Sequence, residues 1–453
     1  MILFWILNFL TFLILRLPSL FEPYWYADEG IYLTIGNALR RGEILYSQIH
    51  DNKPPLLYHL AALAQTTFGF RLLLFFVMIP TIIYFYKLAR YFFNHRLSAF
   101  FTFVFTVVTS IPYFEGHIAN AEIFMLLPTI IGIYFLLKNK LFLSGLGFGI
   151  AFAIKAPVII EAIFGFLWIL FFLKSKTKIK DIIFYILACL LPISLYALYF
   201  LFKGVFSQFF VSALLLNFGY LSSWQTGSMQ NSPLSGGLSQ RAIILFIGWL
   251  IIYFLNKKKI LNSKATFLLA WFSATIFGSL LSGRPYPHYL IQVLPPLTLL
   301  IGFLPLFIFA LSIFIFIVVQ FKFYFYKVIS YYQNFYLNDN NPAYFGSHVS
   351  STYQIAAFIK QNTLPSEKIF IWGDEPCIYA LSDRLPACRY TVAYHVADFN
   401  AYQETINDLN KQKPKYIIYF TNHNRSFKEL DNLINEKYDI LTQIDSALIF
   451  KLK

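Results

Sequence analysis

Side chains capable of chemistry gather in one stretch near the start of the chain, residues 24–60, which reads YWYADEGIYLTIGNALRRGEILYSQIHDNKPPLLYHL. An adjacent acid pair, Asp28 and Glu29, is followed by Tyr32, and Lys53 stands before two prolines with Tyr58 beyond them. A carboxylate can act as a general base towards a hydroxyl. A fixed lysine can stabilise an anion that forms where water is scarce. The stretch therefore carries a candidate base and a candidate anion-binding cation.

Three later segments carry further candidates. YFEGHIANAEIF (113–124) contains Glu122, AIKAP (153–157) contains Lys155, and GRPYPHYLIQVLPPL (283–297) contains Arg284, His288 and Tyr289. An interfacial His-Tyr pair can reach a ligand, but it serves as often as a membrane anchor. For a single acid, a solvated loop position is the ordinary alternative to a functional one.

The elements that position these residues are predicted to lie in a membrane. Of 453 residues, 58% are hydrophobic, 20% are aromatic and only 13% are charged, and the mean hydropathy is +0.60. An ordinary soluble chain has about 25% charged residues. The composition therefore excludes a single water-soluble globule and a disordered chain, and it indicates a polytopic α-helical membrane protein.

The net charge of +14 does not indicate a nucleic-acid partner. Residues 1–320 hold 22 of the 36 Lys and Arg residues but 9 of the 22 Asp and Glu residues, so the positive excess lies in the apolar part. Short basic loops between spans are expected on the cytoplasmic side. We therefore exclude nucleic acid as a partner.

Eleven spans are predicted, within an expected range of about 11 to 13 for such a protein. They are 1–21, 71–89, 97–113, 120–137, 141–156, 157–173, 181–202, 241–256, 264–282, 288–304 and 305–325. The first lacks a basic start and a small-residue cleavage site, so we expect a retained span. Gly145, Gly147 and Gly149 lie inside an apolar run without a preceding strand, which favours close helix packing over a nucleotide loop.

Charge distinguishes spans from the apolar segment 54–69. When this segment is an interfacial helix, thirteen basic residues fall in short cytoplasmic loops: Lys87, Arg90, Arg96, Lys138, Lys140, Lys174, Lys176, Lys178, Lys180, Lys257, Lys258, Lys259 and Lys264. The same topology collects eight of the nine acids of residues 1–320 on the external face, which favours a functional site there.

Residues 1–326 are predicted to form the membrane domain, with external loops at 22–70, 112–121 and 203–240. The last of these is either a mobile lid or a linker. Residues 327–453 are predicted to form a soluble α/β domain with strands at 367–373, 415–420, 438–444 and 447–452 and helices at 351–362, 399–412 and 426–437. The odd number of spans places this domain outside the cytoplasm, although the boundary near Pro305 carries no orienting charge.

Two features of the tail leave alternatives open. Cys377 and Cys388 can pair in an oxidising compartment or remain two free thiols. Asp374, Glu375, Arg384 and Arg389 can form a binding surface or a set of salt-bridged loop residues, and we expect the second.

The ordered set D-E-x-x-Y, R-x-G, L-Y and D-x-K-P-P-L-x-Y within residues 28–58 is more specific than any single pair. It resembles the GT-C glycosyltransferases that use polyprenyl-phosphate sugars, particularly the aminoarabinose transferases and protein O-mannosyltransferases of the glycosyltransferase family 39 type. The resemblance runs along most of residues 1–326 and includes the acid of the second external loop, the Lys at an outer helix end and the later donor-side loop. The tail resembles the extracytoplasmic domains of such enzymes more loosely.

The resemblance implies transfer of a sugar from a polyprenyl phosphate to the hydroxyl of a lipid, glycan or protein acceptor, with inversion, in the plasma (inner) membrane. Asp28 takes the base role with Glu29 beside it, and Lys53, Arg284 and Lys155 bind the donor phosphate. The substrate-binding set is Glu122, Tyr32, Tyr58, His288 and Tyr289. We expect Asp28, Lys53, Glu122 and Arg284 to line one external cavity, with Lys53 next to Asp28.

The chain departs from the aminoarabinose transferases at two places. Gly30 and Ile31 stand where those enzymes carry Thr-Arg, and Asn52 stands where they carry Glu before Lys-Pro. We therefore expect no required cofactor and no metal ligands; a divalent metal ion, though possible, is not supported by Asn52. Aminoarabinose is likewise not inherited as the sugar.

Two alternatives to a single-sugar transferase are kept. A lipid-linked glycan polymerase or ligase would use a similar donor phosphate with a glycan chain. A transporter or flippase is disfavoured, because transporters place charges at mid-membrane within internal repeats, whereas these acids fall in loops and no half-to-half similarity is visible.

Overall fold

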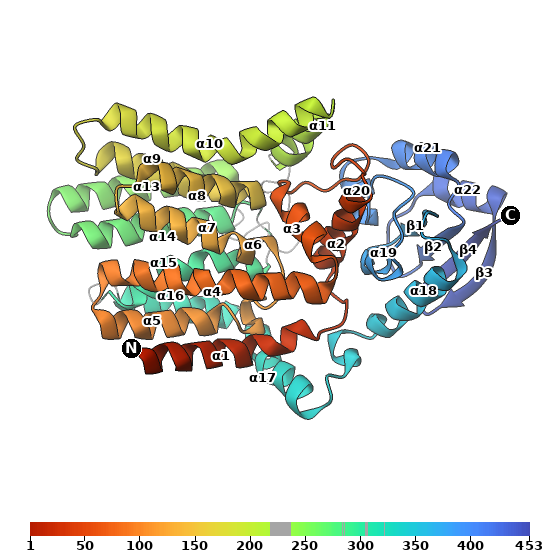
Figure 1. Ribbon diagram of the computed structural model, residues 1–453, viewed down its shortest axis with the longest axis horizontal. Coiled ribbons are helices and arrows are strands. Elements are labelled where there is room, and N and C mark those ends of the chain that lie inside the picture. Colours follow the sequence, from red (N-terminus) through yellow and green to blue (C-terminus); the bar gives the residue numbers. More distant parts are fainter. Residues whose placement is uncertain (218–236, 283, 285, 304–306, 321) are drawn as a thin grey trace. The chain divides into compact units, whose positions relative to one another are not determined.

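The computed structural model describes the chain except residues 218–236, 283, 285, 304–306 and 321 (Figure 1). The chain divides into two units, and each is described by itself. Unit 1 comprises Met1–Ser19, Arg71–Phe202 and Leu214–Gln333. Unit 2 comprises Leu20–Phe70, Lys203–Ala213 and Asn334–Lys453, so it joins the first predicted external loop to the C-terminal segment.

Helices form at all eleven predicted spans, in unit 1 and across its borders. They are α1 (Ile2–Leu20), α4 (Thr67–Phe92), α5 (His95–Val108), α6 (Ala121–Phe124), α7 (Leu126–Leu137), α8 (Leu141–Ile154), α9 (Ile159–Phe171), α10 (Lys178–Phe202), α13 (Leu238–Lys257), α14 (Ser263–Ser279), α15 (Leu294–Ile301), α16 (Phe307–Gln320) and α17 (Lys322–Leu337), with short turns η1 (Pro112–Phe114), η2 (Ala156–Val158) and η5 (Pro287–Val293). Within the described residues, α1, α4, α10 and α13 are each long and apolar enough to cross a membrane. The number of crossings and their direction stay predictions.

Close helix packing at the glycines of α8 is confirmed. This helix lies between α7 and α10. A Cβ at Gly147 would stand 2.7 Å from the carbonyl oxygen of Pro128 in α7, and one at Gly145 would meet the carbonyl oxygen of Tyr185 in α10. Small residues let apolar helices approach to backbone distance, which is how they gain packing energy in lipid.

Unit 2 contains a mixed four-stranded sheet whose strands match the four predicted ones. They are β1 (Phe370–Trp372), β2 (Tyr416–Phe420), β3 (Tyr438–Ile444) and β4 (Ala447–Leu452), in the order β1-β2-β4-β3. β1 and β2 are parallel with Ile371 opposite Ile418, while β4 is antiparallel to both β2 and β3.

Helices cover both faces of this sheet, as an α/β pattern requires. α21 (Tyr402–Gln412) and α22 (Lys428–Lys437) contribute Leu409 and Leu430 to the core around Trp372. α18 (His348–Asn362) and α19 (Cys377–Ser382) contribute Ile355 and Ile378 to the core on the other face. Successive residues of β2 alternate between the two cores, so both faces of the strand are covered and its sequence, YIIYF, is apolar throughout.

The segment Leu20–Phe70 packs on the C-terminal part of unit 2 through α2 (Ala27–Arg40), while α3 (Leu56–Ala64) follows the Lys-Pro-Pro run. A Cβ at Gly30 would stand 2.8 Å from the backbone nitrogen and the sulfur of Cys377 at the start of α19. The Arg41 guanidinium pairs with Asp383 at 2.7 Å. Gly30, which replaces the threonine of the resembling enzymes, therefore permits this contact.

The remaining predictions for the tail resolve in part. Cys377 and Cys388 are buried, and neither forms a disulfide bond within the described residues. Asp374 pairs with Arg425 at 2.6 Å and Arg389 with Glu404 at 2.9 Å, as expected of salt-bridged loop residues. The further elements of the chain are α11 (Phe206–Phe209), η3 (Phe210–Leu215), η7 (Pro342–Phe345) and α20 (Ala393–Asp398). Half of the predicted loop 203–240, and the boundary at Pro305, lie outside the described residues.

Candidate active site

Asp28 lies in the first turn of α2, where the helix dipole favours an acid. The Tyr32 hydroxyl, one turn later, donates to Asp28 Oδ2 at 3.0 Å. The Lys53 Nζ lies 3.9 Å from the same oxygen and 5.0 Å from the centre of the Tyr32 ring. The predicted proximity of Asp28 and Lys53 is confirmed. We call Asp28, Tyr32, Asp51, Lys53 and Tyr58 the loop site.

Two tyrosines fix the backbone at Lys53. Its carbonyl oxygen accepts from the Tyr46 hydroxyl at 2.7 Å, and its N–H donates to the Tyr58 hydroxyl oxygen at 3.2 Å. Pro54 follows and limits the conformations open to Lys53. The prolines and the tyrosine of the D-x-K-P-P-L-x-Y motif therefore help to fix the backbone from which the Lys53 side chain extends.

Asp51 is the second carboxylate of the loop site, and the structure places it 3.5 Å, Oδ2 to Nζ, from Lys53. The side chain is fully buried, and Oδ1 accepts from the Asn52 N–H at 2.7 Å. Burial by itself raises the pKa of this carboxyl, but the Lys53 ammonium and His395 outweigh that effect, so the pKa falls to about 2. Asp51 is thus a buried anion that anchors Lys53.

Exposure separates the two carboxylates. The side chains of Asp28 and Lys53 are 27% and 21% exposed, whereas that of Asp51 is 0% exposed. A general base must come within hydrogen-bonding reach of the proton that it removes. Asp28 meets this condition and Asp51 does not. Glu29 is buried within α2 and does not offer an open carboxylate either.

The C-terminal segment adds a residue that sequence reasoning missed. His395, in α20, places its Nε2 3.7 Å from Asp51 Oδ1. Next to Asp51, the backbone N–H of His50 donates to the carbonyl oxygen of Arg389 at 2.8 Å. A single histidine so far along the chain gives no spacing signal. Only the packing within unit 2 brings it to the loop site.

A second cluster lies in unit 1, and we call Glu115, Glu122, Lys155, His288 and Tyr289 the bundle site. Lys155, which ends α8, pairs with Glu122 in α6, and both side chains are largely buried. His288 bridges two acids, with Nδ1 at 2.6 Å from Glu115 Oε2 and Nε2 at 3.7 Å from Glu122 Oε1. Four of these five residues were predicted site residues. Glu115 was expected only as one of the acids on the external face.

The remaining members of the predicted set lie close by in sequence. The Lys155 Nζ lies 4.6 Å from the centre of the Tyr289 ring, a cation–π distance. Arg284 is half-buried, and its backbone N–H donates to Ser282 Oγ at 3.3 Å. The predicted shared cavity of Asp28, Lys53, Glu122 and Arg284 joins residues of different units and stays a prediction.

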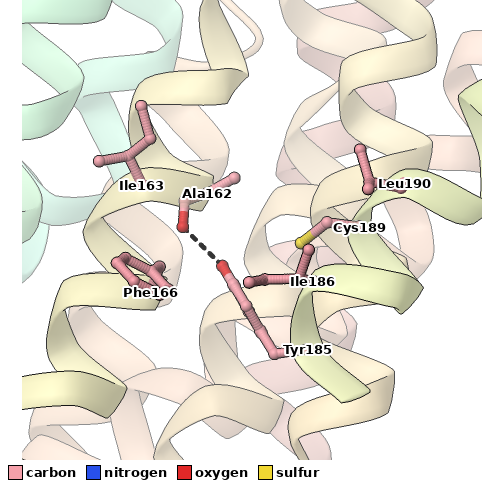
Figure 2. A pocket seen from close by; sticks show the side chains of 7 residues that line it. All are labelled: Ala162, Ile163, Phe166, Tyr185, Ile186, Cys189 and Leu190. Atoms are coloured by element: carbon pink, nitrogen blue, oxygen red, sulfur yellow. Dashed lines mark hydrogen bonds between the residues drawn. The ribbon is translucent and has the colours of Figure 1, made fainter. Parts of the chain in front are cut away.

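An apolar pocket of about 280 Å³ in unit 1 is a poor candidate for the chemistry. Figure 2 shows it between α9 and α10, lined by Ala162, Ile163, Phe166, Tyr185, Ile186, Cys189 and Leu190. The Tyr185 hydroxyl in the pocket lining is already hydrogen-bonded, because it donates to the carbonyl oxygen of Ala162 at 2.7 Å (Figure 2). No charged side chain lines it, so it offers nothing to hold a phosphate.

The loop site does not fit a divalent metal ion. Asn52, an amide, stands where the resembling enzymes carry glutamate, and Asp51 faces Lys53. Among the described residues there is no group of three or more His, Cys, Asp or Glu side chains able to hold a metal. We derive no step through a metal.

Solved structures of other proteins identify the fold that holds these sites. No protein-family model matches the chain, and no curated protein matches it in sequence. Among solved structures, it resembles ArnT from Cupriavidus metallidurans bound to undecaprenyl phosphate, with a TM-score of 0.59 and 13% identity over 99% of this chain and 97% of that one. The same protein in its apo state matches with a TM-score of 0.56 and 12% identity, at the same coverage.

A further match is the apo oligosaccharyltransferase of Archaeoglobus fulgidus, with a TM-score of 0.49 and 13% identity over 92% of this chain and 69% of that one. The two ArnT matches cover nearly the whole chain, C-terminal segment included. At this level of identity they establish the fold. The chain therefore has the GT-C fold of ArnT, as its sequence motifs predicted.

Proposed function

We propose that the chain is an integral-membrane glycosyltransferase that moves a sugar from a polyprenyl phosphate to an acceptor hydroxyl outside the cytoplasm. The loop site carries this proposal: an open carboxylate, Asp28, lies 3.9 Å from a fixed ammonium, Lys53. The ArnT structure, which contains undecaprenyl phosphate and aligns along 99% of this chain, supports a lipid phosphate donor.

The proposed reaction is a direct displacement. The acceptor oxygen attacks the anomeric carbon while Asp28 takes its proton, and the bond from that carbon to the phosphate oxygen breaks. The phosphate leaves with the bonding electrons, and the Lys53 ammonium stabilises its charge. One displacement inverts the anomeric configuration. General-base assistance of this kind is worth about 10²- to 10⁴-fold in rate.

The remaining residues have proposed supporting roles. Tyr32 holds the Asp28 carboxylate, since its hydroxyl donates to Oδ2. Burial raises the pKa of Tyr32 well above its usual value, so this hydroxyl stays a donor at neutral pH. Glu122 would contact the donor sugar. Lys155 and Arg284 would supply further positive charge to the phosphate, and His288 and Tyr289 would contact the substrate.

The experiment that tests this function compares glycolipids and glycoproteins by mass spectrometry. Cells that express the wild-type chain are compared with cells that lack it and with cells that express Asp28→Asn. We expect one glycan mass increment that appears only with the wild-type chain. A single sugar increment indicates the transferase, and a series of repeat-unit increments indicates a polymerase or ligase. Identical profiles in all three cells would remove the proposal.

A further inference from the structure

The C-terminal segment contributes to the loop site through His395, and this inference rests on the proposed function. α20 is tied to the sheet, because the Ala393 N–H donates to the carbonyl oxygen of Gly373 at 2.9 Å, just beyond β1. The Tyr394 N–H lies 3.3 Å from Asp374 Oδ1. These contacts fix the start of α20 next to the end of β1, and His395 is the next residue of the helix.

The charges of the loop site create a need for such a group. Asp51 is fully buried, and Lys53 is its nearest cation, at 3.5 Å. A donor phosphate that recruits Lys53 draws this ammonium away from Asp51. A buried carboxylate that loses its cation is costly, so donor binding is opposed unless another group joins Tyr58 and the Asn52 N–H at Asp51.

His395 is placed to take over. Its side chain is 8% exposed and its Nε2 lies 3.7 Å from Asp51 Oδ1, slightly too far for a hydrogen bond. Hydrogen bonds of this kind are often long in an empty enzyme and shorten when substrate binds. The other ring nitrogen, Nδ1, has no partner in the described part of the chain, so no strong bond holds the ring back.

Besides Asp51, the neighbours of His395 are aromatic rings and a few charged side chains. The His50 ring lies 6.4 Å away, centre to centre, and the Phe399 ring 5.6 Å away. Charges that act on His395 come from Asp51, Lys53, Asp398 and Asp28. Within the described residues, Asp51 alone among these carboxylates lies within salt-bridge distance of the ring.

We propose that His395 is a positioning residue that donates a hydrogen bond to Asp51 when Lys53 moves to the donor phosphate. The C-terminal segment is then a working part of the transferase, and its folding is coupled to donor binding. His395 itself touches neither donor nor acceptor.

The test uses the full-length chain in detergent, with undecaprenyl phosphate as the binding probe and sugar transfer as the second readout. His395→Leu removes the donor group at similar volume. His395→Gln keeps an amide N–H at about the reach of Nε2. His423→Leu is the matched control, because His423 lies beyond β2 and its Nε2 faces the carbonyl oxygen of Trp372 at 3.3 Å.

We expect His395→Leu to weaken undecaprenyl phosphate binding and raise the donor KM by about tenfold, with kcat changed less than threefold. The Gln variant should restore both to within threefold, and the His423 control should match wild type. In an Asp51→Asn background, His395→Leu should have no further effect, because the partner that it serves is gone.

Wild-type affinity in His395→Leu, or full additivity with Asp51→Asn, would overturn the inference while the proposed function stands. A wild-type chain that binds the lipid but transfers no sugar would overturn the proposed function alone, and the binding series still decides the role of His395. A wild-type chain that does not bind the lipid would remove both.

Discussion

The Asp51 carboxylate and the Lys53 ammonium form a buried pair, 3.5 Å from Oδ2 to Nζ, two residues apart in one loop. Asp51 is fully buried and Lys53 is partly open, so the pair has a closed end and an open end. Asp28 stands at the open end. This asymmetry assigns anchoring to one acid of the loop and proton transfer to the other.

The depressed pKa of Asp51 predicts how stability depends on pH. A carboxyl whose pKa is lower in the folded chain stabilises the fold above its unfolded pKa, and it loses that contribution as the pH falls through the folded value. For Asp51 this window runs from about pH 4 down to pH 2, and the contribution is about 2 kcal/mol.

We therefore expect the melting temperature of wild type to exceed that of Asp51→Asn at pH 6, with the difference shrinking as the pH falls towards 2. Thermal melts of both proteins across this range measure it. Asp398→Asn serves as the control. A gap between wild type and Asp51→Asn that stays constant down to pH 2 would contradict the assigned pair.

Removal of the buried cation of the bundle site should destabilise unit 1. Lys155→Met leaves the Glu122 carboxylate, 1% exposed, without its lysine partner, with His288 Nε2 still 3.7 Å away. Breaking one side of such a pair typically costs about 3–5 kcal/mol, and removing both sides costs far less. We expect Lys155→Met to lower the melting temperature strongly and Lys155→Met/Glu122→Gln to recover most of it. The single variant melting like wild type would refute the pairing.

Gly30 should tolerate no side chain. A Cβ there would meet the backbone nitrogen of Cys377 at 2.8 Å, and neither backbone segment can yield without shifting α2 or α19. Overpacking of this kind costs about 1–3 kcal/mol. Gly30→Ala should therefore lower the thermal stability and the transfer activity together.

The matched control for Gly30 is Gly248→Ala in α13, where a Cβ would have no neighbour within 4 Å. Alanine favours a helix over glycine by up to about 1 kcal/mol, so this variant should be at least as stable as wild type. Equal effects at Gly30 and Gly248 would contradict the close contact of α2 with α19.

Topology is tested by cysteine accessibility. Arg96, exposed in the first turn of α5, and Lys258, exposed just after α13, should react only from the cytoplasmic side when each is replaced by Cys. Lys411→Cys, exposed near the end of α21, should react from the opposite side. Labelling with a membrane-impermeant maleimide in intact cells, with lysed cells as the control for reactivity, distinguishes them. A cytoplasmic Lys411 position would mean that one of the last spans is wrong.

The sequence predicted those parts of the molecule that follow from periodicity and from local order. Apolar runs bounded by basic residues predicted the helices of unit 1, and a short run of β-branched and aromatic residues predicted β2, since these properties belong to each segment separately. The proximity of Asp28 and Lys53 was also predictable, because both belong to one loop and an isolated buried ammonium is costly.

The rest depended on packing between distant segments. His395 reaches Asp51 only because α2 packs on α19 and His50, in the loop after α2, pairs with the backbone of Arg389 and Tyr390; no local pattern encodes that contact. The close approach of Gly30 to Cys377 has the same origin. The helix Lys322–Leu337 runs through residue 326, because a change in composition marks a change of surroundings and need not mark the end of a helix.

The roles of Asp28 as base and Lys53 as phosphate-binding cation are separated by measuring sugar transfer and undecaprenyl phosphate binding side by side. The proteins compared are wild type, Asp28→Asn and Lys53→Met, with Glu43→Gln as the control acid. The donor is the lipid-linked sugar that mass spectrometry identifies. We expect Asp28→Asn to lower kcat by at least about 100-fold with lipid binding unchanged. Lys53→Met should weaken binding as well, and Glu43→Gln should resemble wild type. Transfer by Asp28→Asn within tenfold of wild type would contradict the assignment of Asp28 as the base.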